Sequence, residues 1–353
     1  GLALTAPSAG DAVAAGGHLL ADGATHVARL VLTLTALATV LALPARRSEA
    51  MPAIVLATLG HLFCTAAIGL GGLLIGLVLA AAGSLLARRA VDDPGVAAHR
   101  LASVGFALAA FAGAFWCGLG GDLTFAEIRE AIAARPSLPP LAVPLVLVLL
   151  LTGVLLALLA PSRPRRAASA LTTSPTPLGF WLVSAPLVPL VFVPQRLLLP
   201  LPQVAPLAPA NDVLVALGAI LVLASFGIAL LERDLAARLL AAAPGQLGLA
   251  WLAFALVVPD DAIRAAAGGV LLVVPLQVAT GLLVATRSRP AAVAVTLALA
   301  GLATVPPLLG WRLRYVTIEA LLAGDALLTC GLVTLATLLG YVVYLRPVVH
   351  LWR

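Results

Sequence analysis

Long apolar segments follow one another along almost the whole chain, and their length limits the folds open to it. A helix needs about 20 mostly apolar residues to cross a hydrocarbon core of about 30 Å. Hydrophobic residues make up 62% of the 353 residues and charged residues only 10%, which is not the composition of a soluble domain. We therefore predict an all-α polytopic membrane protein with about 11 transmembrane helices, at residues 27–43, 51–67, 70–87, 101–120, 140–160, 178–199, 212–231, 237–257, 263–285, 290–322 and 326–345.

Residues 1–24 differ from the rest of the chain, because they are small, polar and Gly-rich. They lack the apolar stretch that a signal peptide requires. We interpret them as an exposed N-terminal lead-in and residues 25–353 as a single transmembrane domain.

The arginines indicate which side of the membrane each loop occupies. All 21 basic residues are arginine, and the chain has no lysine. With the N-terminus outside, five arginines lie in outer loops or outer span ends: Arg29, Arg129, Arg135, Arg196 and Arg264. Fourteen lie in inner loops: Arg46, Arg47, Arg88, Arg89, Arg100, Arg163, Arg165, Arg166, Arg233, Arg238, Arg287, Arg289, Arg346 and Arg353. Because cytoplasmic loops are enriched in basic residues, we predict an outer N-terminus and a cytoplasmic C-terminus.

The span at 290–322 contains a predicted helix break, at Pro306-Pro307, followed by Arg312 and Arg314. Proline removes a helix hydrogen bond, and a break at membrane depth must be covered by other protein. A charge at that depth costs roughly 2.5–3.5 kcal/mol on insertion scales and usually has a function. This stretch is therefore the first candidate for a functional site.

Two halves of the chain, 51–199 and 212–345, each hold five predicted spans and run in opposite senses. The fourth span of the first half ends at Pro161 and Pro164, and the fourth of the second half breaks at Pro306-Pro307. Discontinuous helices at matching places in inverted repeats are typical of transporters. The alternative interpretation is that Pro161 simply ends a helix.

Seven stretches, in order from residue 20 to 352, resemble the antiporter-like membrane subunits of respiratory complex I. They are DGATHVARL (Asp22–Leu30), ATLG with GL (Ala57–Gly60 and Gly76-Leu77), DLTFAEI (Asp122–Ile128), SPTPLGFWLVSAP (Ser174–Pro186), RDLAARLLAAAPGQLG (Arg233–Gly248), LAGLATVPPLLGWRLRY (Leu299–Tyr315) and GYVVYLRPVVHLW (Gly340–Trp352). The Pro-Thr-Pro stretch and the Tyr-Leu-Arg tail resemble subunit N more than subunits L and M. Counterparts of the family's first two helices and its last helix are expected to be missing.

The resemblance implies a non-catalytic membrane subunit of an NADH–quinone oxidoreductase, a complex that moves protons in the respiratory chain. Its partners would be other membrane subunits and lipids, with no nucleic acid. NADH, flavin, iron–sulfur clusters and quinone would be bound by partner subunits, and no cofactor by this chain. The residues agree with that expectation, because they contain no Gly-rich phosphate loop and no metal-ligand spacing, and the three cysteines lie within apolar runs.

The family's proton relay is a row of titratable groups, a glutamate and lysines with histidine sometimes substituting. The glutamate position corresponds to Val78, the first lysine falls within the apolar Leu155–Leu159, and the second lysine corresponds to Leu187. A histidine or glutamine position corresponds to Gln246, and the final lysine to Arg314. Arginine does not deprotonate in proteins. We therefore predict that this chain carries no protons through its own middle and has a structural or coupling role.

Other polar residues have a functional and a structural interpretation. His61, within a predicted span, is a proton-path candidate, but a buried neutral histidine often has only a structural role. Glu319 could pair with Arg312 or Arg314, or with another helix or subunit. We expect Gln277 to form a hydrogen bond between helices and Arg196 to extend toward the membrane edge.

Three other functions fit parts of the sequence. One is a subunit of a membrane-bound hydrogenase or carbon-uptake complex with the same fold. A second is a stand-alone cation/proton antiporter, which would need titratable groups at the repeat interface. A third is an assembly or scaffold protein without a role in energy coupling.

Overall fold

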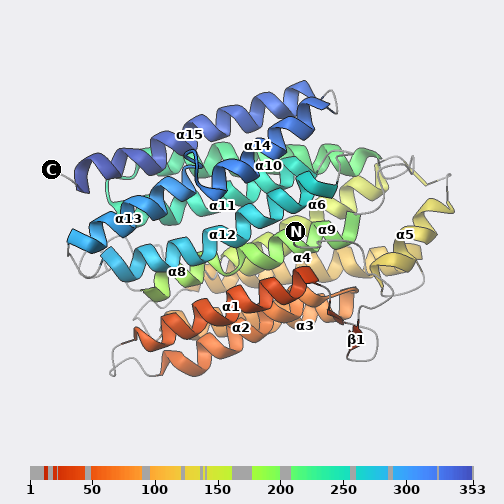
Figure 1. The fold of residues 1–353 in the computed structure, drawn as a ribbon. Helices are drawn as coiled ribbons and strands as arrows, with labels where there is room; N and C mark the ends of the chain where they lie inside the picture. Colours follow the sequence, from red (N-terminus) through yellow and green to blue (C-terminus); the bar gives the residue numbers. More distant parts are fainter. Residues whose placement is uncertain are drawn as a thin grey trace. The chain divides into compact units, whose positions relative to one another are not determined.

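The computed structural model describes residues 12–14, 19–21, 23–43, 49–89, 96–120, 124–135, 138–139, 141–160, 177–198, 208–254, 260–284, 289–323 and 326–351. Nearly all of these residues are helical (Figure 1). The exception among regular elements is a short antiparallel pair, β1 (Ala12–Ala14) and β2 (Leu19–Ala21), within the predicted lead-in.

The helices confirm the predicted fold class. They are α1 (Gly23–Leu41), α2 (Ala50–Ala66), α3 (Leu70–Arg89), α4 (Val96–Gly120), α5 (Phe125–Ala133), α6 (Ala142–Leu159), α8 (Pro177–Ser184), α9 (Leu187–Leu198), α10 (Ala208–Leu231), α11 (Leu235–Phe254), α12 (Asp260–Val284), α13 (Arg289–Leu302), α14 (Leu309–Ala323) and α15 (Leu327–Leu351). Seven helical segments are long and apolar enough to cross a membrane, and four shorter apolar helices accompany them. Each of these eleven overlaps one of the eleven predicted spans, although in the span 290–322 it covers only α13 and not α14. The chain is therefore a multi-pass membrane protein.

The chain divides into two compact units. Unit 1 comprises Gly1–Thr33, Arg46–Arg163 and Val188–Leu214, and unit 2 comprises Leu34–Ala45, Pro164–Leu187 and Val215–Arg353. The span predicted at 178–199 is interrupted by a turn at Ala185 and Pro186, between α8 and α9. The span predicted at 140–160 is the continuous helix α6, and Pro161 and Pro164 lie outside the described residues.

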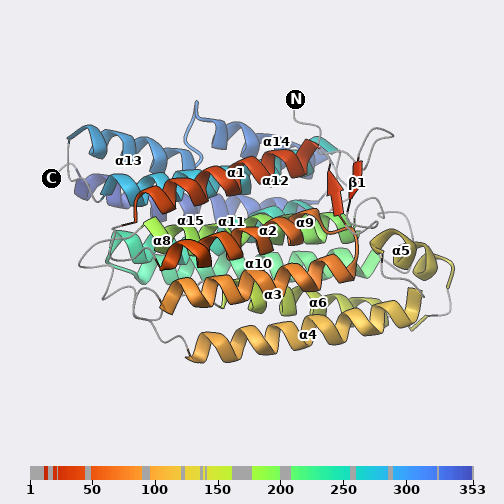
Figure 2. The same cartoon turned by 90° about the horizontal axis from the view of Figure 1, so that it is seen from below.

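Glycines let the helices of unit 1 pack with their backbones close together. A Cβ atom added to Gly76 on α3 would lie 2.6 Å from the backbone nitrogen of Cys64 on α2. A Cβ added to Gly153 on α6 would lie 2.5 Å from the nitrogen of Ala109 on α4. Figure 2 shows α2 beside α3 and α4 beside α6. Small residues at helix contacts are the usual means of close packing in membranes, where lipid removes the hydrophobic drive between helices.

Two arginines of unit 1 bind the backbone at helix ends. Arg196 on α9 donates from Nε to the Thr65 carbonyl oxygen (3.1 Å) and from Nη2 to Thr25 Oγ1 (2.6 Å). Arg88 on α3 donates to the carbonyl oxygen of Ala160, just after α6, at 3.4 Å. The last carbonyls of a helix have no partner within it, so these bonds satisfy them. Arg196 therefore binds within unit 1, where we expected it to extend toward the membrane edge.

In unit 2, α12 packs against α8, α11, α13 and α14, while α15 packs against α11, α13 and α14. Gln277 on α12 is fully buried, and its side-chain nitrogen donates to the Leu239 carbonyl oxygen on α11 at 3.1 Å. This bond confirms the expected hydrogen bond between helices. Large aromatic side chains, including Trp181, Trp251 and Phe226, fill the rest of the interior.

The close approach of α2 and α3 predicts different effects for alanine at two glycines of α3. Gly76→Ala should destabilise the chain by about 1–3 kcal/mol, because the new methyl group overpacks the contact with Cys64. Gly71→Ala is the control, since a Cβ there meets nothing within 4 Å, and its better helix propensity should leave stability unchanged or raised by up to about 1 kcal/mol. Thermal melting of the purified chain in detergent measures both, and equal melting temperatures would contradict this packing.

Candidate functional site

The predicted break lies between α13, which ends at Leu302, and α14, which begins at Leu309. The intervening residues 303–308 form turns, and the Pro306-Pro307 peptide bond is cis. Figure 1 shows the two helices as separate blue ribbons joined by this connection, alongside α15. The broken helix predicted from the double proline is confirmed.

Side chains from neighbouring helices bind the backbone at this break. The side-chain nitrogen of Gln246 on α11 donates to the Leu302 carbonyl oxygen at 3.3 Å. The hydroxyl of Tyr341 on α15 donates to the Thr304 carbonyl oxygen at 3.2 Å. Where water is absent, a carbonyl left unpaired at the end of α13 would cost about 1–3 kcal/mol. These two bonds therefore allow a helix to end inside the apolar interior.

The backbone at the break is strained at one residue. Thr304 has a φ of 60°, in the left-handed region that β-branched residues rarely adopt. Close packing at the break also depends on a glycine, because a Cβ at Gly310 would clash with the Gly301 carbonyl oxygen. The first turn of α14 is thus held close to the last turn of α13.

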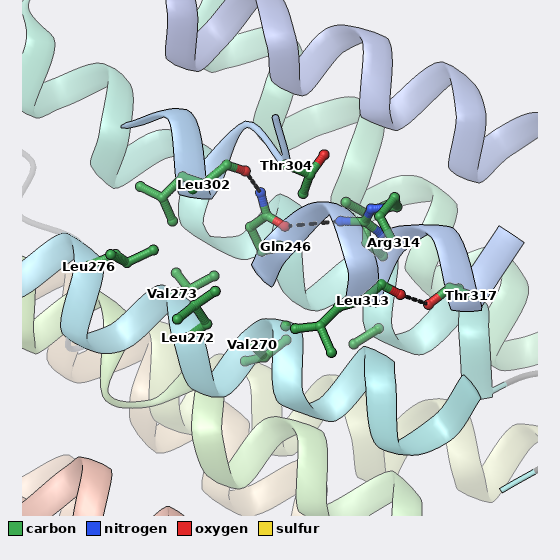
Figure 3. Close-up of a pocket in the computed structure, with 15 residues that line it drawn as sticks. Gln246, Val270, Leu272, Val273, Leu276, Leu302, Thr304, Leu313, Arg314 and Thr317 are labelled. Atoms are coloured by element: carbon green, nitrogen blue, oxygen red, sulfur yellow. Dashed lines mark hydrogen bonds between the residues drawn. The ribbon is translucent and has the colours of Figure 1, made fainter. Parts of the chain in front are cut away.

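A polar cluster surrounds the break, and we call Gln246, Thr304, Arg314 and Tyr344 the break cluster. Arg314 on α14 donates from Nη2 to Gln246 Oε1 at 3.3 Å, and the Gln246 nitrogen lies 3.4 Å from the Tyr344 hydroxyl oxygen on α15. Gln246 and Tyr344 are buried, and Arg314 is partly buried. Figure 3 shows Gln246 between the Leu302 carbonyl and Arg314. Gln246 therefore connects α11 to both sides of the break.

A cavity of about 30 Å³ adjoins the break cluster. Its polar lining residues are Gln246, Thr304, Arg314 and Thr317, and the others are apolar or glycine, among them Val273, Leu276 and Leu313. The Thr317 hydroxyl donates to the Leu313 carbonyl oxygen at 2.9 Å. Two buried polar atoms of the lining residues, Arg314 Nε and Thr304 Oγ1, have no hydrogen-bond partner within the part of the chain that the structure describes.

The structure brings two of the sequence candidates together and places the others elsewhere. Gln246 and Arg314 bond to each other in unit 2, while His61 is buried on α2 in unit 1. Arg312 and Glu319 are exposed on α14, and no ion pair joins Glu319 to either arginine.

The structure also describes the predicted relay positions that hold no titratable group. Val78 on α3 is 49% exposed, whereas Leu187, the first residue of α9, is completely buried. In the stretch Leu155–Leu159, the last three residues are buried. Their assignment as former relay sites stays a prediction, because it depends on the family resemblance.

Sequence analysis missed Tyr344, Tyr341 and Thr304 as parts of the site. The signal was the Tyr-x-x-Tyr spacing in GYVVYLR, which puts Tyr341 and Tyr344 on neighbouring turns of one helix. The phenol hydroxyl groups of tyrosines need polar partners once they are buried.

The chemistry open to the break cluster is hydrogen bonding around a fixed positive charge. Glutamine does not titrate, and arginine and tyrosine keep their ordinary protonation states near neutral pH. Among the described residues, no group of three or more His, Cys, Asp or Glu side chains could hold a metal ion.

The sequence matches no protein-family model and no curated protein. Three solved structures of membrane complexes contain chains with a similar fold. A chain of respiratory complex I from Thermus thermophilus has a TM-score of 0.75 and 19% identity, over 96% of this chain and 78% of that one. A chain of the archaeal membrane-bound sulfane sulfur reductase has a TM-score of 0.71 and 16% identity, over 96% and 75%. A chain of the Mrp complex from Dietzia sp. DQ12-45-1b has a TM-score of 0.70 and 16% identity, over 93% and 66%.

These likenesses show a shared fold. The chain is built like a membrane-embedded chain of large respiratory and Mrp complexes. With identities of 16–19%, residue roles in those chains do not transfer to this one.

The strained Thr304 predicts that glycine stabilises the break. Thr304→Gly should raise the free energy of unfolding by about 1 kcal/mol relative to Thr304→Ala, because glycine adopts a positive φ without a Cβ penalty. Both variants lack the Thr304 hydroxyl, so their difference isolates the backbone term. Thermal melting in detergent measures it, and an alanine variant as stable as the glycine variant would contradict the strain.

Proposed function

We propose that this chain is an antiporter-like membrane subunit, of the subunit N type, in a bacterial NADH–quinone oxidoreductase or a related proton-translocating respiratory complex. The fold shared with chains of complex I, sulfane sulfur reductase and Mrp complexes supports the antiporter-like class. The seven motif resemblances in chain order support the subunit N type. In this proposal the N-terminus lies outside, the C-terminus is cytoplasmic, and other membrane subunits are the partners.

The role that we propose within the complex is structural and coupling, without proton conduction through this chain. The observation that carries it is the bond between Arg314 and Gln246 at the break. A proton relay needs groups that gain and lose a proton, and neither side chain does so readily. Val78, Leu187 and the apolar end of α6 add no such group.

Arg314 could still transmit an electrostatic signal. Its fixed charge at an effective dielectric constant of 20 would interact with a unit charge about 10 Å away by about 1.7 kcal/mol. The charged form of a carboxylate or quinone in a neighbouring subunit would then be stabilised, relative to its neutral form, by that amount. This is the sense in which the chain would couple without conducting.

The absence of conduction is tested with the purified chain in proteoliposomes. Under an imposed membrane potential, the wild type and Arg314→Gln should show the same low proton uptake, at the level of empty liposomes. Arg312→Gln, an exposed arginine on the same helix, is the matched control. Robust uptake by the wild type that Arg314→Gln abolishes and Arg312→Gln preserves would contradict the proposal.

The identity of the complex is tested by purifying the tagged native assembly in mild detergent and identifying its subunits by mass spectrometry. We expect other membrane subunits together with flavin- and iron–sulfur-binding subunits that accept electrons from NADH. Hydrogenase-type or sulfur-reducing subunits would instead assign the chain to a related complex, as the likeness to the sulfane sulfur reductase suggests. Co-purification with antiporter subunits alone would favour the cation/proton antiporter, consistent with the likeness to the Mrp chain.

A further inference from the structure

The break cluster contains a cation whose counter-charge is missing from the described part of the chain. Arg314 carries a permanent positive charge, and among the described residues its side chain forms one hydrogen bond, to the neutral amide oxygen of Gln246. Buried charges in proteins are normally paired, because removal from water is costly without a partner. No carboxylate among the described residues lies within ion-pair distance of Arg314.

Two carboxylates of unit 2, Glu319 and Asp234, do not supply this counter-charge. Glu319 is exposed and lies five residues further along α14. Asp234 precedes α11 and accepts a bond from the Ala237 nitrogen at 2.9 Å. Gln246 lies twelve positions after Asp234, which is about 18 Å along a helix axis. The neutralising charge must therefore come from outside these side chains.

The cavity beside Arg314 offers the space. A volume of about 30 Å³, measured for water-sized probes, accommodates roughly two water molecules at about 10–15 Å³ each. A halide ion together with one water molecule fits that volume. The predominantly apolar lining would leave a bound ion with few other polar contacts than those of the break cluster.

The unsatisfied atoms of the lining residues have the polarity that an anion requires. Arg314 Nε can only donate a hydrogen bond, and Thr304 Oγ1 carries a hydroxyl proton that it can donate. Both atoms are buried without a partner. The Gln246 amide is already engaged, its oxygen with Arg314 and its nitrogen with Leu302 and Tyr344. The two open donors therefore favour an anion over a cation.

We propose that this cavity binds a small monovalent anion of halide size, held by Arg314 and Thr304. The anion neutralises Arg314 in place of a carboxylate and satisfies both open donors. The proposal rests on unit 2 alone and does not depend on the complex to which the chain belongs.

The test is thermal melting of the full chain in lipid nanodiscs, titrated with sodium bromide against sodium gluconate at constant ionic strength. The wild type should show a saturable rise in melting temperature with bromide. Arg314→Gln should lose it. Arg312→Gln, the exposed control on the same helix, should keep it unchanged. Thr304→Val keeps the shape but removes the hydroxyl donor, and should raise the half-saturating bromide concentration several-fold.

Gln246→Glu supplies a second test, which does not require Arg314 to be removed. It places a carboxylate at hydrogen-bond distance from Arg314 but loses the donor to the Leu302 carbonyl oxygen. Whatever its melting temperature in gluconate, that temperature should no longer rise with bromide. If Arg314→Gln does not fold, Gln246→Glu and Thr304→Val decide the matter.

Three outcomes would overturn the proposal. A wild type that melts at the same temperature in bromide and gluconate has no such site. A bromide response of equal size in Gln246→Glu or Arg314→Gln would place the ion elsewhere. A carboxylate of a partner subunit found within ion-pair distance of Arg314 in the structure of the native complex would assign the counter-charge to that partner.

Discussion

The lack of water inside a membrane is the constraint on which unit 2 depends. A helix that ends at Leu302 leaves carbonyl oxygens that only protein groups can satisfy. Gln246 and Tyr341 do so from α11 and α15, and Gln246 also binds Arg314 on the far side of the break. Each such group left buried and unpaired would cost about 1–3 kcal/mol. The polar residues of the break cluster thus have a structural reason to be there, independent of any proton path.

A polar residue in a membrane helix is therefore not by itself a sign of a proton path, because it can be there to satisfy the backbone. A titratable group in the same place could both satisfy the backbone and transfer protons, whereas glutamine can only satisfy it. The bond between Gln246 and Arg314 keeps the support of the broken helix and offers no site for exchanging a proton. Support and conduction are therefore separable at this break, and the chain has the residues for the first.

The sequence was sufficient to predict where the helices lie along the chain, but not which side chains make contact between them. Apolar length placed all eleven spans, and Pro306-Pro307 located the break, because both are local properties of the chain. The turn at Ala185 and Pro186 was missed, since the apolar pattern continues through it. The bonds of Gln246 with Arg314 and Tyr344 join residues 68 and 98 positions apart. A local sequence pattern cannot predict contacts between residues so far apart in the chain. The family resemblance pointed to Gln246 and Arg314 as separate positions and did not predict that they contact each other.

The predicted relay positions Leu187 and Val78, which hold apolar residues, have different surroundings in the structure. Leu187 is completely buried, so an aliphatic side chain there packs like the rest of the interior. Val78 is 49% exposed on α3, and a glutamate there would face whatever surrounds this chain. A charge at the centre of a bilayer costs roughly 2.5–3.5 kcal/mol on insertion scales. Only a neighbouring subunit with a complementary charge could offset that cost, so valine leaves this face of α3 compatible with lipid as well as with an apolar partner.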